Sequence, residues 1–285
     1  MGIVYLGPVD GGDLHGIVKL LREASHIDGP VLIHVMTHKG AGYAPAERHP
    51  ARFHGTEPFD IETGLPKNPR VKANYTDIFS TVMRKLGDRD EKVVAITAAM
   101  ADGTGLKRFR NMFPERFFDV GIAEEHAVAL ASGIAKNGGT PVYGVYSTFI
   151  QRTYDQLSQD LCINKNPAVI LVFAASVYGM NDVTHLGLFD IPMMSNIPNL
   201  VYLAPTCKEE YFKILDFAMT QKENPVAIRV PGMGVVSRGI EDNTDYSKLN
   251  KFEVTKKGKD VAIIALGDFY SLGEEVLNTL SKEGI

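Results

Sequence analysis

Tryptophan is absent from this 285-residue chain, and cysteine occurs only twice, as Cys162 and Cys207. Two cysteines cannot build the disulfide framework of a small secreted domain, and they lack the short spacing of a metal site. We therefore expect a reduced, cytoplasmic protein. Long apolar runs are missing as well: the longest, residues 168–175, is far below the roughly 18 residues that a membrane span needs.

An excess of charge of one sign is also missing. Lysine and arginine number 30, aspartate and glutamate 34, and the net charge is −4. Without a basic footprint, neither nucleic acid nor a membrane surface is an expected partner. Hydrophobic residues make up 45% and charged residues 22% of the chain, as in an ordinary globular protein with a sizeable core.

What is present is an alternation of short β-branched runs with amphipathic segments. This pattern predicts an α/β fold built on a doubly wound, mainly parallel sheet. The predicted central strands span residues 92–97, 116–120, 141–145, 168–173, 200–204 and 225–230. A helix around residues 14–25 and a strand at 31–36 precede them, and a strand and a helix are predicted within 260–285. Thr206 and Glu209 predict a capping box that opens a helix over 207–221.

The first and last segments supply too few elements to close a core of their own. Residues 37–72 form a long connection rich in glycine, proline and charge, and a polar linker follows near residue 241. We therefore expect an intact central domain flanked by pieces of two others, and a chain that is part of a longer protein.

The stretch "DVGIAEEHAV", residues 119–128, places two glutamates at the start of a helix predicted over 123–137. The positions three, four and seven residues after Glu124 are all apolar, whereas the stripe that follows Glu125 is weaker. A buried carboxylate is costly unless it is paired, so Glu124 is the better candidate for an acid held for chemistry. The alternative is that both acids only complement the helix dipole.

Two further segments carry residue types that suit a ligand site. In "YSTFIQRTYDQ", residues 146–156, Phe149 and Arg152 are three apart and share a helix face. An aromatic ring beside a guanidinium suits a flat, partly charged ligand, and it equally suits an ordinary helix packed on a sheet. His185 lies in a polar, glycine-bearing loop over 178–190, where a histidine is either solvated or functional.

Six ordered motifs carry a resemblance: "YLGPVDGGDL", "MTHKGAGYAPAE", "FHGTEPFD", "FDVGIAEEHAV", "YSTFIQRTYDQ" and "THLGLFD". Together they resemble the 1-deoxy-D-xylulose-5-phosphate synthases, thiamine-diphosphate enzymes of the transketolase superfamily. The resemblance implies the thiamine-diphosphate-binding fold, with the following organisation. Residues 1–54 are the tail of the diphosphate-binding domain, 55–73 a linker, 74–236 the pyrimidine-binding domain, 237–251 a linker and 252–285 the start of a third domain.

The same resemblance implies roles for individual residues. Cofactor contacts are implied for Tyr43, Glu124, Tyr146, Phe149 and Arg152, with Glu124 bonded to the aminopyrimidine ring. Catalytic roles are implied for Glu124, His54 and His185, and binding of the sugar phosphate for Arg229. The implied reaction condenses pyruvate with glyceraldehyde 3-phosphate in a homodimer, with the hard chemistry supplied by the cofactor.

Three departures from the family pattern leave alternatives open. The Gly-Asp-Gly motif of the metal and diphosphate site is absent, so no residue here is assigned to a metal, and Mg²⁺ is expected through a domain outside this chain. Ala174 and Asn181 stand where the family pattern has an arginine and an aspartate, and a second basic residue after Arg229 is missing. The alternatives are a related enzyme with a different acceptor, or a non-catalytic fragment or partner-binding subunit.

Overall fold

The computed structural model describes residues 2–177, 183–232, 234–248 and 253–285. The chain divides into two compact units, Met1–Val71 and Lys72–Ile285. Asn181, singled out above, lies outside the described residues.

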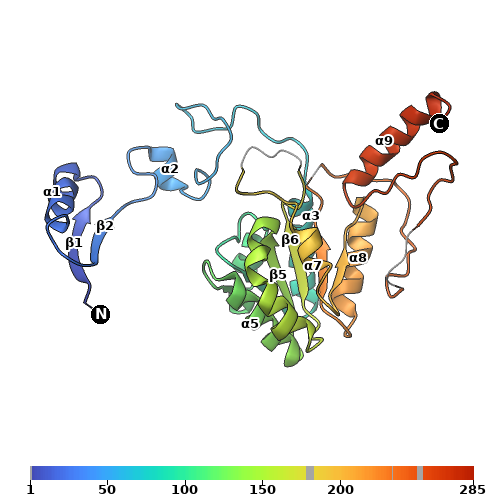
Figure 1. Ribbon diagram of the computed structural model, residues 1–285, viewed down its shortest axis with the longest axis horizontal. Helices are drawn as coiled ribbons and strands as arrows, with labels where there is room; N and C mark the ends of the chain where they lie inside the picture. The colour runs from blue at the N-terminus through green and yellow to red at the C-terminus, as the bar shows by residue number, and fades with distance from the viewer. Residues whose placement is uncertain (1, 178–182, 233, 249–252) are drawn as a thin grey trace. The chain divides into compact units, whose positions relative to one another are not determined.

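The first unit is built on two parallel strands, β1 (Val4–Asp10) and β2 (Val31–Met36), joined by helix α1 (Leu14–Ala24). α1 lies along both strands (Figure 1). The predicted helix and the strand at 31–36 are confirmed. β1 was not predicted, because Gly7 and Pro8 interrupt it and read as a turn; the pairing register shifts between Leu6 and Val9 to accommodate them. A short helix, α2 (Ala44–Arg48), follows in the connection.

The second unit contains a six-stranded sheet in which every neighbouring pair is parallel. Its strand order is β4-β3-β5-β6-β8-β7. The strands are β3 (Val93–Thr97), β4 (Phe117–Asp119), β5 (Thr140–Tyr146), β6 (Val169–Phe173), β7 (Val201–Leu203) and β8 (Val226–Arg229). All six predicted central strands, and the mainly parallel α/β fold, are confirmed.

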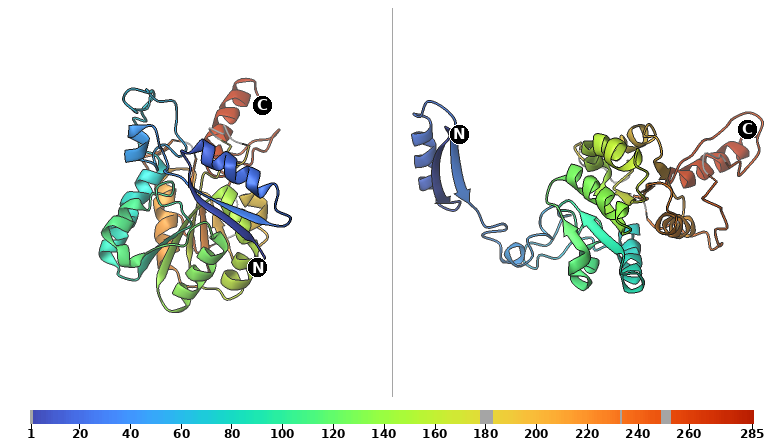
Figure 2. Two further views of the ribbon diagram at one scale, coloured as in Figure 1. Left: turned by 90° about the vertical axis from the view of Figure 1, so that its left-hand side faces the viewer. Right: turned by 90° about the horizontal axis from the view of Figure 1, so that it is seen from below.

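Helices cover both faces of this sheet (Figures 1 and 2). One face packs against α3 (Tyr75–Arg89), α4 (Lys107–Met112) and α8 (Lys208–Thr220). The other packs against α5 (Glu124–Lys136), α7 (Asp190–Met194) and the π-helical segment η3 (Gln156–Cys162).

The remaining elements are α6 (Ser147–Ile150), α9 (Phe269–Lys282) and the 3-10 turns η1 (Pro114–Arg116) and η2 (Gln151–Thr153). The helix face that Phe149 and Arg152 were expected to share is thus divided, with Phe149 in α6 and Arg152 in η2.

The strand order fixes where a ligand site can lie. From β3 the chain moves to β4 on one side and then returns to β5 on the other side of β3. In open parallel sheets, the loops that leave such a reversal diverge and open a crevice at the carboxyl ends of the strands. Glu124 follows β4, and Phe149 and Arg152 follow β5, so the sequence places them around this reversal.

Two local predictions are wrong. No strand forms at residues 261–266, because a strand exists only through pairing with a neighbour and none of the described strands lies beside it. The capping box of Thr206 with Glu209 is also absent. α8 begins one residue later, with Cys207 as its N-cap, and the backbone N–H and hydroxyl of Thr206 both donate to Glu210.

Glu209 instead stabilises the segment that follows β8. Its carboxylate accepts hydrogen bonds from the Ser237 hydroxyl at 2.5 Å and from the backbone N–H of Arg238 at 3.1 Å. These two bonds, led by the one from Ser237, lower the pKa of Glu209 to about 2. A lowered folded-state pKa means stability that is present above the ordinary pKa and is lost as the pH falls toward about 2.

We therefore predict that Glu209→Gln lowers the melting temperature at pH 7 and that the difference from wild type disappears between pH 5 and pH 2. Thermal unfolding followed by circular dichroism across this range measures the effect. A difference that stays constant with pH would contradict the assignment.

Candidate functional site

Glu124 is the first residue of α5, and its side chain turns into the protein. The residue is 2% exposed and lies on the same helix face as Ala127, Val128 and Ala131, which are all buried. The side chain of Glu125, by contrast, is 39% exposed. Of the two glutamates in this first turn, Glu124 is therefore the buried one.

Arg152 is the charged partner of both glutamates. Its Nη1 lies 3.2 Å from Glu124 Oε2, and its Nε lies 3.4 Å from Glu125 Oε1. The guanidinium offsets part of the cost of burying the Glu124 carboxylate, although a side chain that is 48% exposed is screened by water. Among the described residues, no hydrogen bond reaches the buried Oε2 of Glu124. This atom can therefore accept a further donor.

Tyr143 is a neighbour that sequence reasoning missed. It lies on β5, is fully buried, and belongs to the same core cluster as Ala127, Val128 and Ala131. Burial, and after it the carboxylates of Glu124 and Glu125, raise the pKa of Tyr143, so the phenol keeps its proton. In the sequence Tyr143 has the pattern of an ordinary core residue of a strand, and nothing signals its position under an acid.

Three of the predicted site residues come together at the end of β5 and in the segments that follow β5 and β6. The rings of Tyr146 and Phe149 are parallel, with an interplanar angle of 2° and centroids 6.0 Å apart. The ring of His185 meets Phe149 edge-on at 5.4 Å, and its Nδ1 lies 2.8 Å from the hydroxyl of Thr184. Tyr146, Phe149 and His185 thus form one aromatic group near the carboxyl ends of β5 and β6.

Asp119 fixes the turn that leads into α5. One carboxylate oxygen accepts the backbone N–H of Ala99 at 2.8 Å and that of Gly121 at 3.1 Å. Ala99 has φ 57° and Gly121 has φ 71°, a region that costs a non-glycine residue energy and is populated only when other contacts hold it. Asp119 thereby ties the loop after β3 to the end of β4, next to the crevice.

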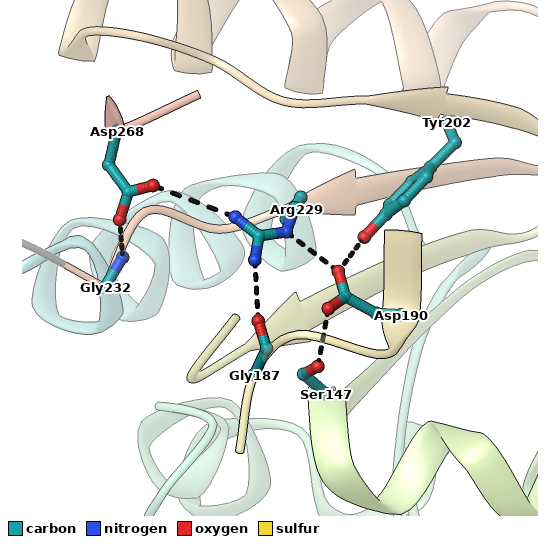
Figure 3. Close-up of polar contacts among 7 residues, drawn as sticks. All are labelled: Ser147, Gly187, Asp190, Tyr202, Arg229, Gly232 and Asp268. Atoms are coloured by element: carbon teal, nitrogen blue, oxygen red, sulfur yellow. Dashed lines mark hydrogen bonds and ion pairs between the residues drawn. The ribbon is translucent and has the colours of Figure 1, made fainter. Parts of the chain in front are cut away.

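Arg229 lies in a buried polar network (Figure 3). Its Nε donates to Asp190 Oδ2 at 2.8 Å and its Nη2 donates to the Gly187 carbonyl at 2.7 Å. Its Nη1 lies 3.7 Å from Asp268 Oδ1. Arg229 is 5% exposed and Asp190 is 0% exposed. The binding of a sugar phosphate by Arg229 stays a prediction, and any phosphate would compete with these partners.

Tyr43 and His54 belong to the first unit and are described within it. The Tyr43 hydroxyl donates to the Ile61 carbonyl at 2.9 Å, and its ring packs against Phe53 and Phe59. His54 Nδ1 lies 2.8 Å from the ammonium of Lys39. Their relation to the residues around Glu124 stays a prediction.

Metal-ligating clusters and membrane-spanning helices are both absent from the part of the chain that the structure describes. Within residues 2–177, 183–232, 234–248 and 253–285, no cluster of three or more histidine, cysteine, aspartate or glutamate side chains could hold a metal ion. In that same part of the chain, no helix is both long and apolar enough to cross a bilayer.

Comparison with known proteins gives matches along the whole chain. The family described as transketolase, pyrimidine binding domain, matches residues 71–234, and that described as 1-deoxy-D-xylulose-5-phosphate synthase matches residues 1–37. The 1-deoxy-D-xylulose-5-phosphate synthases of Halothermothrix orenii and Clostridium acetobutylicum are 44% and 43% identical to it over its full length. The chain spans 45% and 46% of these relatives, which is less than half of their length.

Solved structures agree with the fold. A structure titled split gene transketolase, inactive beta4 tetramer, is 26% identical, with a TM-score of 0.59 over 75% of this chain and 69% of that one. The transketolase of Pichia stipitis is 16% identical, with a TM-score of 0.66 over 99% of this chain and 54% of that one, and it supports the fold alone.

The second unit is thus a doubly wound α/β domain with a buried acid at the reversal of its strand order. The chain belongs to the transketolase pyrimidine-binding domain family. Throughout its length it is similar to 1-deoxy-D-xylulose-5-phosphate synthases, as the six sequence motifs indicated.

The ion pair of Arg152 with Glu124 can be tested by stability. Arg152→Met leaves the buried carboxylate without its counter-charge, and we expect the free energy of unfolding to fall by about 1 kcal/mol, or roughly 2–4 °C in melting temperature. In the Glu124→Gln background the same arginine change should cost much less, because the charge to be compensated is gone. Glu125→Gln is the matched control background, because it removes the more exposed glutamate of the pair and keeps Glu124. Equal effects of Arg152→Met in both backgrounds would contradict the pairing.

Proposed function

We propose that this chain forms the aminopyrimidine side of a thiamine-diphosphate site. The enzyme would condense pyruvate with D-glyceraldehyde 3-phosphate to 1-deoxy-D-xylulose 5-phosphate. The proposal rests on the state of Glu124. This acid is buried at the strand reversal, and its Oε2 accepts no hydrogen bond from the described residues. Similarity to relatives with this activity in their names supports the substrates and favours them over a different acceptor.

The residues around Glu124 fit a flat, nitrogen-bearing heterocycle. The open lone pairs on Oε2 suit a ring N–H, and the faces of Tyr146 and Phe149 suit stacking against a planar ring. When bound, thiamine diphosphate would supply the acidic carbon and the electron sink that decarboxylation of a 2-keto acid requires.

The chain's own residues would hold and move protons around that group. Glu124 would share a proton with the ring nitrogen, in a niche from which Ala127 and Val128 exclude water. Arg152 would keep the charge of the carboxylate compensated at the solvent side. His185, held edge-on against Phe149, would exchange a proton with the substrate at its ring nitrogen.

The remaining parts of the site are assigned by the resemblance. The resemblance assigns a cofactor contact to Tyr43 and a catalytic role to His54, both in the segment 1–54, which it identifies as the tail of a diphosphate-binding domain. We assign the diphosphate and Mg²⁺ to the region of the relatives that this chain does not match. The resemblance implies that Arg229 binds the sugar phosphate, a role that its buried contacts with Asp190 and Gly187 oppose. A cytoplasmic location is proposed from the two free, buried cysteines, Cys162 and Cys207.

We further propose a homodimer that uses the outer face of α5. An exposed, shallow surface there is lined by His126, Ala129, Leu130, Gly133, Ile134, Asn137 and Gly139. Ala129 and Gly133 are four residues apart and small, which allows a second helix to approach closely. Leu130 and Ile134 flank them and supply apolar area.

The role of Glu124 is tested by replacing each glutamate of the pair in the full-length gene product. Glu124→Ala should abolish thiamine-dependent formation of 1-deoxy-D-xylulose 5-phosphate, with a loss of at least about a hundredfold in kcat, because the proton-sharing acid is gone. Glu125→Ala should retain most of the activity. Product formation from pyruvate and glyceraldehyde 3-phosphate is the measurement, and normal turnover by the Glu124 variant would refute its role.

The dimer is tested at Gly133, where an added Cβ meets no side chain and no backbone from outside its own helix within 4 Å. Gly133→Ala should therefore leave the fold and the dimer intact, whereas Gly133→Leu should block close approach of a second helix and give a monomer. Sedimentation velocity measures the two masses. A monomeric wild-type chain, or a dimer that survives Gly133→Leu, would overturn the proposed surface.

A further inference from the structure

The segment that carries His185, residues 183–190, is attached to the rest of the domain at both of its ends. At its first end, the hydroxyl of Thr148 donates to the Thr184 carbonyl at 2.9 Å, and the ring of His185 contacts Phe149. Both partners belong to α6. At its last end, Asp190 contacts Ser147, which is the first residue of the same short helix. α6 therefore meets this segment twice.

Asp190 carries the second attachment through a single buried carboxylate (Figure 3). Its Oδ1 accepts the hydroxyl of Ser147 at 2.9 Å. Its Oδ2 accepts both the Nε of Arg229, at 2.8 Å, and the hydroxyl of Tyr202. Burial raises the pKa of Tyr202, and Asp190 raises it further, so this phenol stays a donor. One side chain thus joins α6, β7 and β8 to the start of α7.

Between the two ends, Gly187 packs directly on the chain that follows β6. A Cβ at Gly187 would lie 2.2 Å from the Ala174 carbonyl oxygen and 2.4 Å from the Ser176 nitrogen, so only glycine fits. The carbonyl of Gly187 accepts Nη2 of Arg229 at 2.7 Å. The guanidinium therefore binds the segment at two points, Gly187 and Asp190.

These contacts occupy Arg229. Its Nε and Nη2 are used within the segment, its Nη1 faces Asp268 at 3.7 Å, and the residue is almost completely buried. Removing one partner of such a buried pair leaves an uncompensated charge, whereas removing both together is far less costly. Arg229 therefore has the contacts of a buried counter-ion.

We propose that Asp190 is a positioning residue that holds His185 against Phe149, and that Arg229 serves as its buried counter-ion instead of as a direct ligand of a substrate phosphate. The catalytic role of His185 rests on the proposed function. The attachment of residues 183–190 is a property of the chain and can be measured without cofactor or substrate.

The first experiment measures backbone hydrogen exchange in the full 285-residue chain. Asp190→Asn keeps the size of the side chain but removes its charge, and we expect exchange at residues 183–189 and 147–150 to rise at least tenfold, with α3 unchanged. Tyr202→Phe removes one hydroxyl only and should give a smaller rise in the same residues. If Asp190→Asn does not fold, Tyr202→Phe alone tests the positioning role of Asp190.

Matched variants separate positioning from a general loss of stability. Asp268→Asn alters the long contact to Arg229 and spares Asp190, so exchange at 183–189 should change less than threefold. Arg229→Gln should raise it as Asp190→Asn does, and the double variant should exchange no faster than either single one. Unchanged exchange in both Asp190→Asn and Tyr202→Phe, or a rise spread evenly over α3 and the segment, would overturn the positioning role.

The second experiment uses steady-state kinetics of the full-length gene product. For a positioning pair, Asp190→Asn and Arg229→Gln should both lower kcat at least tenfold and change KM for glyceraldehyde 3-phosphate less than threefold. A rise of tenfold or more in that KM, seen with Arg229→Gln alone, would show a phosphate ligand and overturn the proposal. If the wild type lacks this activity, the proposed function fails, and the exchange experiment still decides the attachment.

Discussion

The reversal of strand order around β3 is the constraint on which the rest of the site depends. Because β4 and β5 lie on opposite sides of β3, the segments that follow these strands diverge at one edge of the sheet. Glu124 opens the helix after β4, and Phe149 and Arg152 lie just after β5. A buried acid, an aromatic face and a guanidinium are thus placed together by topology, although they are far apart in the sequence.

The carboxylates at this edge differ in how many of their hydrogen bonds are made within the chain. Asp190 accepts three hydrogen bonds, from Ser147, Tyr202 and Arg229, and Asp119 accepts two backbone N–H groups. Glu124 has an ion pair with Arg152 but a buried Oε2 that no described residue hydrogen-bonds. Glu124 therefore keeps hydrogen-bonding capacity open, as Asp268 does at its Oδ1, whereas the hydrogen bonds of Asp190 and Asp119 are made within the chain.

The spacing of apolar residues was sufficient to predict the central strands, but not the side-chain contacts between elements. The central strands read correctly because β-branched runs buried on both faces have a strong pattern, and Glu124 was found because apolar residues follow it at helical spacing. The run at 261–266 has the same composition and forms no strand, because pairing is not encoded in the run itself. Asp190 ends the motif "THLGLFD", but its contacts could not be predicted from it, because its partners come from other strands and helices, and Tyr143 has the pattern of an ordinary core residue.

The state of Arg229 has a consequence for how an anionic substrate could be held at this edge. Its guanidinium is enclosed by Asp190, Gly187 and Asp268, and position 174, where the family pattern has an arginine, is an alanine. Releasing Arg229 to a phosphate would leave the carboxylate of Asp190 buried without its counter-ion, which is costly. Arg152, by contrast, is about half exposed and pairs with Glu124 and Glu125 at the start of α5. If a phosphorylated aldehyde binds here, its charge must be met without dismantling the Asp190–Arg229 pair, because that pair is what holds the segment of His185 in place.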